Sequence, residues 1–103
     1  MPVPPPAVRR VAADGLRLRE EYGRGGTEIG VARARDLSGG QNVSIDTLRR
    51  MISYFDRHEI DLDAPAARRG HPDYPSAGKI AWLLWGGDSG RAWARRELAA
   101  IES

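Results

Sequence analysis

The sequence contains no cysteine, so its residues can form neither a disulfide nor a thiolate metal site. Lys79 is the only lysine, and there is a single phenylalanine. No apolar run approaches the roughly 20 residues of a membrane-spanning helix, and no stretch alternates apolar and polar residues as a half-buried strand does. We therefore expect no membrane partner, and the predicted fold class is all-α.

Apolar residues recur at helical spacing along most of the chain. The length of 103 residues suits one domain, and we expect a compact bundle of four to five short helices. The spacing predicts helices over about 7–22, 28–37, 45–58, 77–85 and 89–101.

Short polar residues precede these segments and are typical helix N-caps. Thr27, Ser44 and Ser76 are expected to cap the second, third and fourth helices. Asp88 or Ser89 is expected to cap the last one. In the first helix, we expect an apolar line through Val8, Val11, Leu18 and Tyr22, with Gly15 on the same line where another helix packs closely.

Two segments are expected to lie outside the helices. Residues 1–6 include PVPPP, which predicts a stiff Pro-rich arm ahead of a single helical domain over 7–103. Pro6 suits the first position of the helix that follows. Residues 60–76 predict a long loop that Tyr74 pins to the core.

All three tryptophans fall within the segment WLLWGGDSGRAW. Large aromatic rings in a chain with little phenylalanine favour a core role, and the paired glycines favour a corner between two helices. A stacking platform for bases or a partner surface is the alternative. The predicted core and corner residues are Trp82, Trp85, Gly86, Gly87, Asp88 and Trp93.

Motifs that suggest catalysis or cofactor binding lack the context that such chemistry needs. GDSG at 87–90 matches the nucleophile segment of chymotrypsin-like proteases, but it lies between helices instead of in a double β-barrel, so Ser89 is not expected to be a nucleophile. HEIDLD at 58–63 clusters His58 with acids, yet no HExxH or EF-hand pattern is present. We therefore expect no catalytic residue, no metal and no cofactor.

Arginine is the most suggestive component. Short helices joined by the SGGQN loop at 38–42 have the outline of a helix-turn-helix, and arginine binds phosphate through a bidentate fork. A GC-rich genome would favour arginine without any function. The predicted nucleic-acid-binding residues are Arg33, Arg35, Arg49, Arg50, Arg57 and Lys79.

GVARARDLSGGQNVSIDTLRRMISYFDRHEID, with PSAGKIAWLLWGGDSGRAWA after it, resembles a small domain of bacteriophage and prophage proteins. The resemblance covers about residues 8–98. It implies a place in the cytoplasm of a host cell or in a virion. It implies no activity, and no catalytic residue carries over.

The leading functional hypothesis is a non-enzymatic phage-type helical module that binds nucleic acid or a nucleoprotein through an arginine face. The alternative is a protein–protein interaction module, either a head-assembly or packaging accessory or a small inhibitor of a host protein. The start, MPVPPPAVRR, lacks the pattern of a secretory signal, which agrees with a cytoplasmic or virion location. An enzyme is a third class, and it would need a pocket near Asp61, Asp63 or Asp88.

Overall fold

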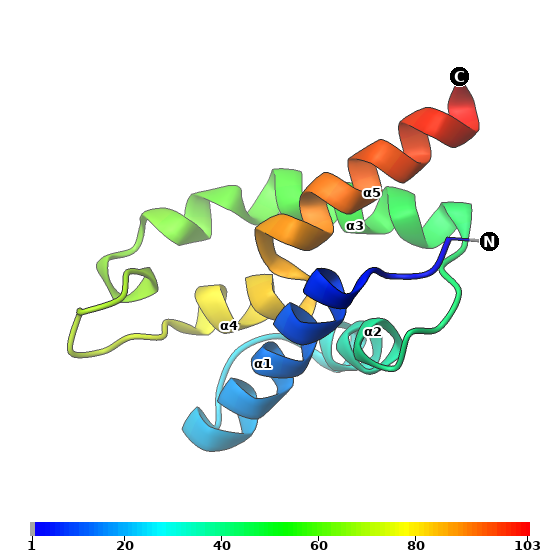
Figure 1. The fold of residues 1–103 in the computed structure, drawn as a ribbon. Helices are drawn as coiled ribbons and strands as arrows, with labels where there is room; N and C mark the ends of the chain where they lie inside the picture. Colours follow the sequence, from blue (N-terminus) through cyan, green and yellow to red (C-terminus); the bar gives the residue numbers. More distant parts are fainter. Residues whose placement is uncertain (1) are drawn as a thin grey trace.

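Five α-helices and two short 3₁₀-helices form the structure, a computed structural model that describes residues 2–103. No strand occurs within that range, so the all-α prediction is confirmed. The 3₁₀-helices, η1 and η2, lie between the third and fourth α-helices (Figure 1). The α-helices are α1 (Pro6–Tyr22), α2 (Glu28–Ser38), α3 (Ile45–His58), α4 (Ala77–Leu84) and α5 (Gly87–Glu102).

Three of the helices begin at the residues that the sequence predicts. The Thr27 hydroxyl accepts a hydrogen bond from the Gly30 amide at 3.3 Å. Ser44 and Ser76 accept in the same way from the amides three residues later, at 3.1 and 3.0 Å. Each side chain satisfies an amide that would otherwise lack a partner at the start of its helix.

The start of α5 differs from the prediction. Gly86 is its N-cap, and neither Asp88 nor Ser89 caps it. Gly86 and Gly87 have φ values of 107° and 62°, a region that only glycine enters at little cost, and this turns the chain sharply between α4 and α5. Asp88 then lies inside the first turn, where its carboxylate accepts a hydrogen bond from the Trp82 indole at 3.0 Å.

The helices pack as two groups. α3 packs on α5, whereas α1 packs on α2 and α4 (Figure 1). The side chains between the groups are fully or almost fully buried and are mostly large and apolar. They include Leu48, Phe55, Trp82, Leu84 and Trp93.

The contact between α1 and α4 is close because α1 presents small residues there. Its buried residues are Val8, Ala12 and Gly15. A Cβ atom at Gly15 would lie 2.7 Å from the backbone nitrogen of Leu84, so glycine is required. The predicted apolar line is correct at Val8 and Gly15, whereas Val11 and Leu18 are only half-buried and Tyr22 at its end is exposed.

The two ends of the molecule are tied down. At one end, the buried Pro4 holds the arm, and the Val43 amide donates to the Pro2 carbonyl at 2.8 Å. At the other end, the segment predicted as a plain loop contains η1 (Glu59–Asp63) and η2 (Pro65–Ala67). The Arg24 guanidinium donates to the carbonyl oxygens of Asp73 and Pro75, which fixes the rest of that segment.

Candidate binding groove

The six basic residues predicted to bind nucleic acid do not form one continuous face. Arg49 donates to Glu102 at the end of α5, at 2.9 Å. Arg50 donates along its own helix to Asp46, also at 2.9 Å. Lys79 lines a separate hollow between α1 and α4.

The other three arginines also differ in environment. Arg33 is mostly buried, with its guanidinium carbon 5.6 Å from the centre of the Trp85 ring and a nitrogen 3.8 Å from Asp36. Arg35 and Arg57 are exposed. Half of this set is therefore occupied by carboxylates or aromatic rings.

The helix-turn-helix outline is wrong. In that motif the two consecutive helices pack on one another, and the second enters the major groove. Here α2 packs mainly on α1, and α3 packs mainly on α5. The SGGQN loop joins two helices that belong to different groups.

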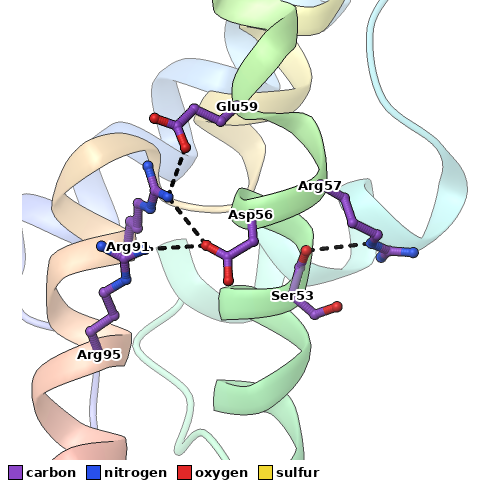
Figure 2. A network of polar contacts seen from close by, with 6 residues as sticks. All are labelled: Ser53, Asp56, Arg57, Glu59, Arg91 and Arg95. Carbon is purple, nitrogen blue, oxygen red and sulfur yellow. Dashed lines mark hydrogen bonds and ion pairs between the residues drawn. The ribbon is translucent and has the colours of Figure 1, made fainter.

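On the side of α3 that faces α5, arginines and carboxylates neutralise each other. Arg91 donates to Glu59 at 3.1 Å and to Asp56 at 3.2 Å, and Arg95 donates to Asp56 at 3.1 Å (Figure 2). The Arg91 guanidinium also lies over the Trp82 ring at 5.7 Å. The hydrogen bond to Glu59 raises the pKa of Arg91 above its ordinary value, and the bond to Asp56 adds to this effect. This network joins α3 to α5 and leaves few free charges.

On the opposite side of α3 lies a groove of about 530 Å³. One wall is α3, the other is the start of α2, and α4 with η1 closes the rest. Its polar lining comes mainly from α3 and its apolar lining mainly from α2 and α4. The lining residues are Gly26, Thr27, Ile29, Arg50, Ser53, Tyr54, Arg57, His58, Asp61, Ala77, Gly78, Ala81 and Trp85.

Stacked aromatic side chains stiffen the groove. The rings of His58 and Tyr54 stack with centroids 4.6 Å apart, and those of Tyr54 and Trp85 stack at 4.6 Å and an interplanar angle of 7°. The Arg33 guanidinium also lies over the Trp85 ring. Tyr54 and Trp85 are only 6% and 9% exposed, so they offer little ring surface for bases to stack on.

The Tyr54 hydroxyl is buried and has no hydrogen-bond partner within residues 2–103. Burial raises the pKa of this phenol well above its ordinary value, and the Asp61 carboxylate raises it further. The phenol therefore stays neutral at neutral pH.

At one end of the groove, His58 Nδ1 lies 3.1 Å from Asp61 Oδ2. Asp61 packs against the first turn of α4, where a Cβ atom at Gly78 would lie only 2.8 Å from the Asp61 Cβ. A carboxylate at a helix N-terminus is stabilised by the helix dipole. The pair thus places a fixed polar group at the end of a mainly apolar groove.

The described residues contain no group of three or more side chains suited to hold a metal ion. Ser89 is exposed in the first turn of α5. No histidine or carboxylate in residues 2–103 hydrogen-bonds to it.

All three tryptophans are at least nine-tenths buried.

No family model, curated protein or solved structure matches this chain in the comparisons. The resemblance to a bacteriophage domain therefore stays a prediction. Of the helices over residues 2–103, none combines the length and the apolar character needed to cross a bilayer.

The groove could not be predicted from the sequence. Arg50 and Arg57 are predicted phosphate contacts, and the acidic cluster that includes His58 and Asp61 is predicted not to hold a metal, but no pattern in the sequence brings them together with Ile29. The one indication in the sequence is Ile29, an apolar residue near the start of a helix that has few other apolar residues. It is 63% exposed and stands on the rim.

Proposed function

We propose that the protein is a non-enzymatic interaction module whose groove binds an acidic, amphipathic segment of a partner protein. The observation that carries this proposal is the combination of an apolar groove, an exposed isoleucine on its rim and an arginine without a carboxylate partner, Arg57, on its α3 wall. If the phage resemblance holds, the partner is a phage or host protein in the host cytoplasm or the virion.

The apolar lining favours a partner with an apolar anchor. Ile29 leaves most of its surface in water, and Ala77 at the start of α4 is exposed as well. Covering such surface yields roughly 25 cal/mol per Å². Binding clefts typically combine an apolar lining with a few placed polar groups, as here.

The charged residues favour an acidic partner. Arg50 and Arg57 lie two turns apart on α3, a rise of about 10 Å. The Arg57 Nε donates to the carbonyl of Ser53 within its own helix, and no carboxylate within residues 2–103 pairs with its guanidinium (Figure 2). Arg50 already pairs with Asp46, so Arg57 is the cation on this wall that an acidic residue of a partner would meet, beside an apolar anchor on a helix laid along the groove.

Nucleic acid is the other class of occupant, and the arginine content of the sequence favours it. Arg35, Arg57 and Lys79 have no carboxylate partner in the part of the chain that the structure describes, and they are free to contact phosphate. They lie on separate parts of the surface, and the aromatic rings are covered. We therefore treat nucleic-acid binding as an alternative outcome of the experiment below.

The test is a selection of displayed random peptides on the wild-type protein, with depletion on the variant Ile29→Glu/Arg57→Glu. Both side chains are exposed, so we expect the variant to fold. The matched control is Ile101→Glu/Arg96→Glu, an exposed pair on α5 outside the groove. We expect enriched peptides that combine apolar residues at helical spacing with glutamate or aspartate. They should bind wild type and control alike, and the groove variant about tenfold or more weakly.

Salt separates the two classes of partner. An apolar-anchored peptide should lose little affinity between low and high salt, whereas phosphate binding falls linearly with the logarithm of salt concentration. The same proteins are titrated with a random-sequence duplex and with single-stranded DNA. Steep salt-dependent DNA binding, together with no peptide that distinguishes wild type from the groove variant, would overturn the proposal in favour of nucleic acid.

A further inference from the structure

A second hollow of about 380 Å³ lies on the other side of α4 from the groove. It is enclosed by α1, by α4 and by the segment that follows η2. The groove uses Ala77 and Ala81 of α4, whereas this hollow uses Lys79 and Leu83. The two sites therefore belong to different faces of the molecule.

Three cations surround this hollow, and each comes from a different element. Arg17 belongs to α1, Arg69 follows η2, and Lys79 belongs to α4. Arg69 and Lys79 pair with no carboxylate within residues 2–103. Cations from three directions suit a tetrahedral anion better than a planar carboxylate, which a single arginine fork can satisfy.

Acidic residues reduce this positive charge only in part. Asp14 also lines the hollow, and its carboxylate lies 3.8 Å from the Arg17 guanidinium. Glu21 lies 3.6 Å from the same arginine. With Asp14 and Glu21 both counted against the three cations, the site keeps a charge of +1, and Arg69 and Lys79 have no carboxylate partner within residues 2–103.

The rest of the lining is apolar or aromatic. Val11, Leu18 and Leu83 form an apolar side, and Tyr74 stands beside them. Tyr74 is held in place, because its amide donates to the His71 carbonyl at 3.0 Å and the following Pro75 is buried. A site that is already formed loses less entropy when its ligand binds.

We propose that this hollow binds a phosphate group carried on an apolar or aromatic body, such as a nucleoside monophosphate. Arg17, Arg69 and Lys79 bind the phosphate, and Tyr74 with the apolar side chains contacts the body. The phosphate belongs either to a free phosphorylated small molecule or to the phosphorylated end of a nucleic-acid strand. This site is independent of the groove and of its proposed partner.

The test measures binding at low salt by calorimetry, with a nucleoside monophosphate, the unphosphorylated nucleoside and inorganic phosphate as probes. The variant Arg69→Gln/Lys79→Gln removes two of the three cations. The matched control is Arg68→Gln/Arg96→Gln, two arginines outside the hollow, one of them next to Arg69. Thermal melting of both variants establishes that they fold.

We expect the nucleoside monophosphate to bind more tightly than either the nucleoside or inorganic phosphate. The hollow variant should lose about tenfold or more in affinity, and the control little. Equal binding of nucleoside and monophosphate, equal losses in both variants, or no binding would overturn the site.

A single-stranded oligonucleotide, with and without a 5′-phosphate, distinguishes the two sources. Preferential binding of the phosphorylated strand, lost in the hollow variant, would identify a nucleic-acid end. Binding of the mononucleotide alone would identify a free small molecule. An oligonucleotide that binds equally with and without its phosphate, and equally to both variants, would contradict the site, since it would report surface charge alone.

Discussion

The two sides of α3 carry charged residues in opposite circumstances. Toward α5, Asp56 and Glu59 accept hydrogen bonds from Arg91 and Arg95, so these charges neutralise one another within the fold. Toward the groove, Arg57 has only a carbonyl of its own helix as a partner (Figure 2). An arginine is therefore no sign of binding by itself, because what matters is whether the fold already supplies its partner.

The same comparison holds for the apolar residues. Phe55 faces the core and is fully buried, and it meets the Trp82 ring edge-on at 4.7 Å. Ile29 on the groove rim is mostly in water although it is as apolar. The side of α3 that faces the core is thus fully covered by other residues of the chain. The groove along its other side leaves apolar surface of Ile29, from α2, that a partner could cover.

The largest effect should come from breaking the corner that places α5 on α3. In Gly86→Ala/Gly87→Ala, two alanines would have to adopt positive φ values, and the new Cβ atoms would lie 2.9 Å from Gly90 Cα and 2.7 Å from Val11 Cγ1. We expect a loss of about 3 kcal/mol or more in the free energy of unfolding, measured by denaturant titration.

A control separates backbone strain from crowding. Gly23→Ala/Gly70→Ala also places two alanines at positive φ, but nothing lies within 4 Å of either new Cβ. Its loss in the free energy of unfolding should therefore be clearly smaller than that of Gly86→Ala/Gly87→Ala. If the two double variants lose the same stability, or if neither melts earlier than wild type, the α4–α5 corner is not held by close packing.

The helices could be predicted from the sequence because their signals are local. Thr27, Ser44 and Ser76 act on amides only three residues away, and the glycines at 23–26 and 86–87 end helices through their own backbone freedom. The α5 cap was wrong because Asp88 binds Trp82, which comes six residues earlier, instead of an amide of its own helix.

The candidate sites could not be predicted because the ion pairs that decide which arginines stay free join distant parts of the chain. Arg91 and Asp56 are 35 residues apart, and Arg49 and Glu102 are 53 apart. Helical spacing shows that Arg49 and Arg50 leave α3 in different directions. It does not show which direction meets α5 and which opens into a groove.

An intermediate effect should distinguish the two sides of α3 directly. Arg91→Gln removes two carboxylate contacts and the packing over Trp82. Because Asp56 and Glu59 are more than half exposed, we expect a loss of only about 1 kcal/mol. Arg57→Gln on the groove side should stay within about 0.5 kcal/mol of wild type. Equal losses of stability in Arg91→Gln and Arg57→Gln, measured by chemical denaturation, would mean that the ion pairs of Arg91 stabilise the fold no more than an exposed charge does.

The smallest effect at neutral pH should come from Tyr54→Phe. The hydroxyl is buried without a partner, so removing it relieves an unpaired polar group, and we expect a change within about 1 kcal/mol that is neutral or stabilising. A clear loss of stability in chemical denaturation would mean that the hydroxyl has a partner, such as an ordered water.

Alkaline pH should enlarge the difference between wild type and Tyr54→Phe. Because burial raises the pKa of Tyr54 in the folded state, the unfolded chain releases this proton near the ordinary value of 10.0 while the folded protein keeps it. The unfolded state then binds fewer protons, so stability falls as pH rises above that value, by up to about 1.4 kcal/mol per pH unit for one group. Tyr54→Phe lacks this contribution and should lose stability less steeply in denaturant titrations above pH 10.0, with Tyr22→Phe as the exposed control. Parallel slopes for wild type and Tyr54→Phe would mean that water reaches the phenol through the groove, and that this side of α3 is more open than the structure describes.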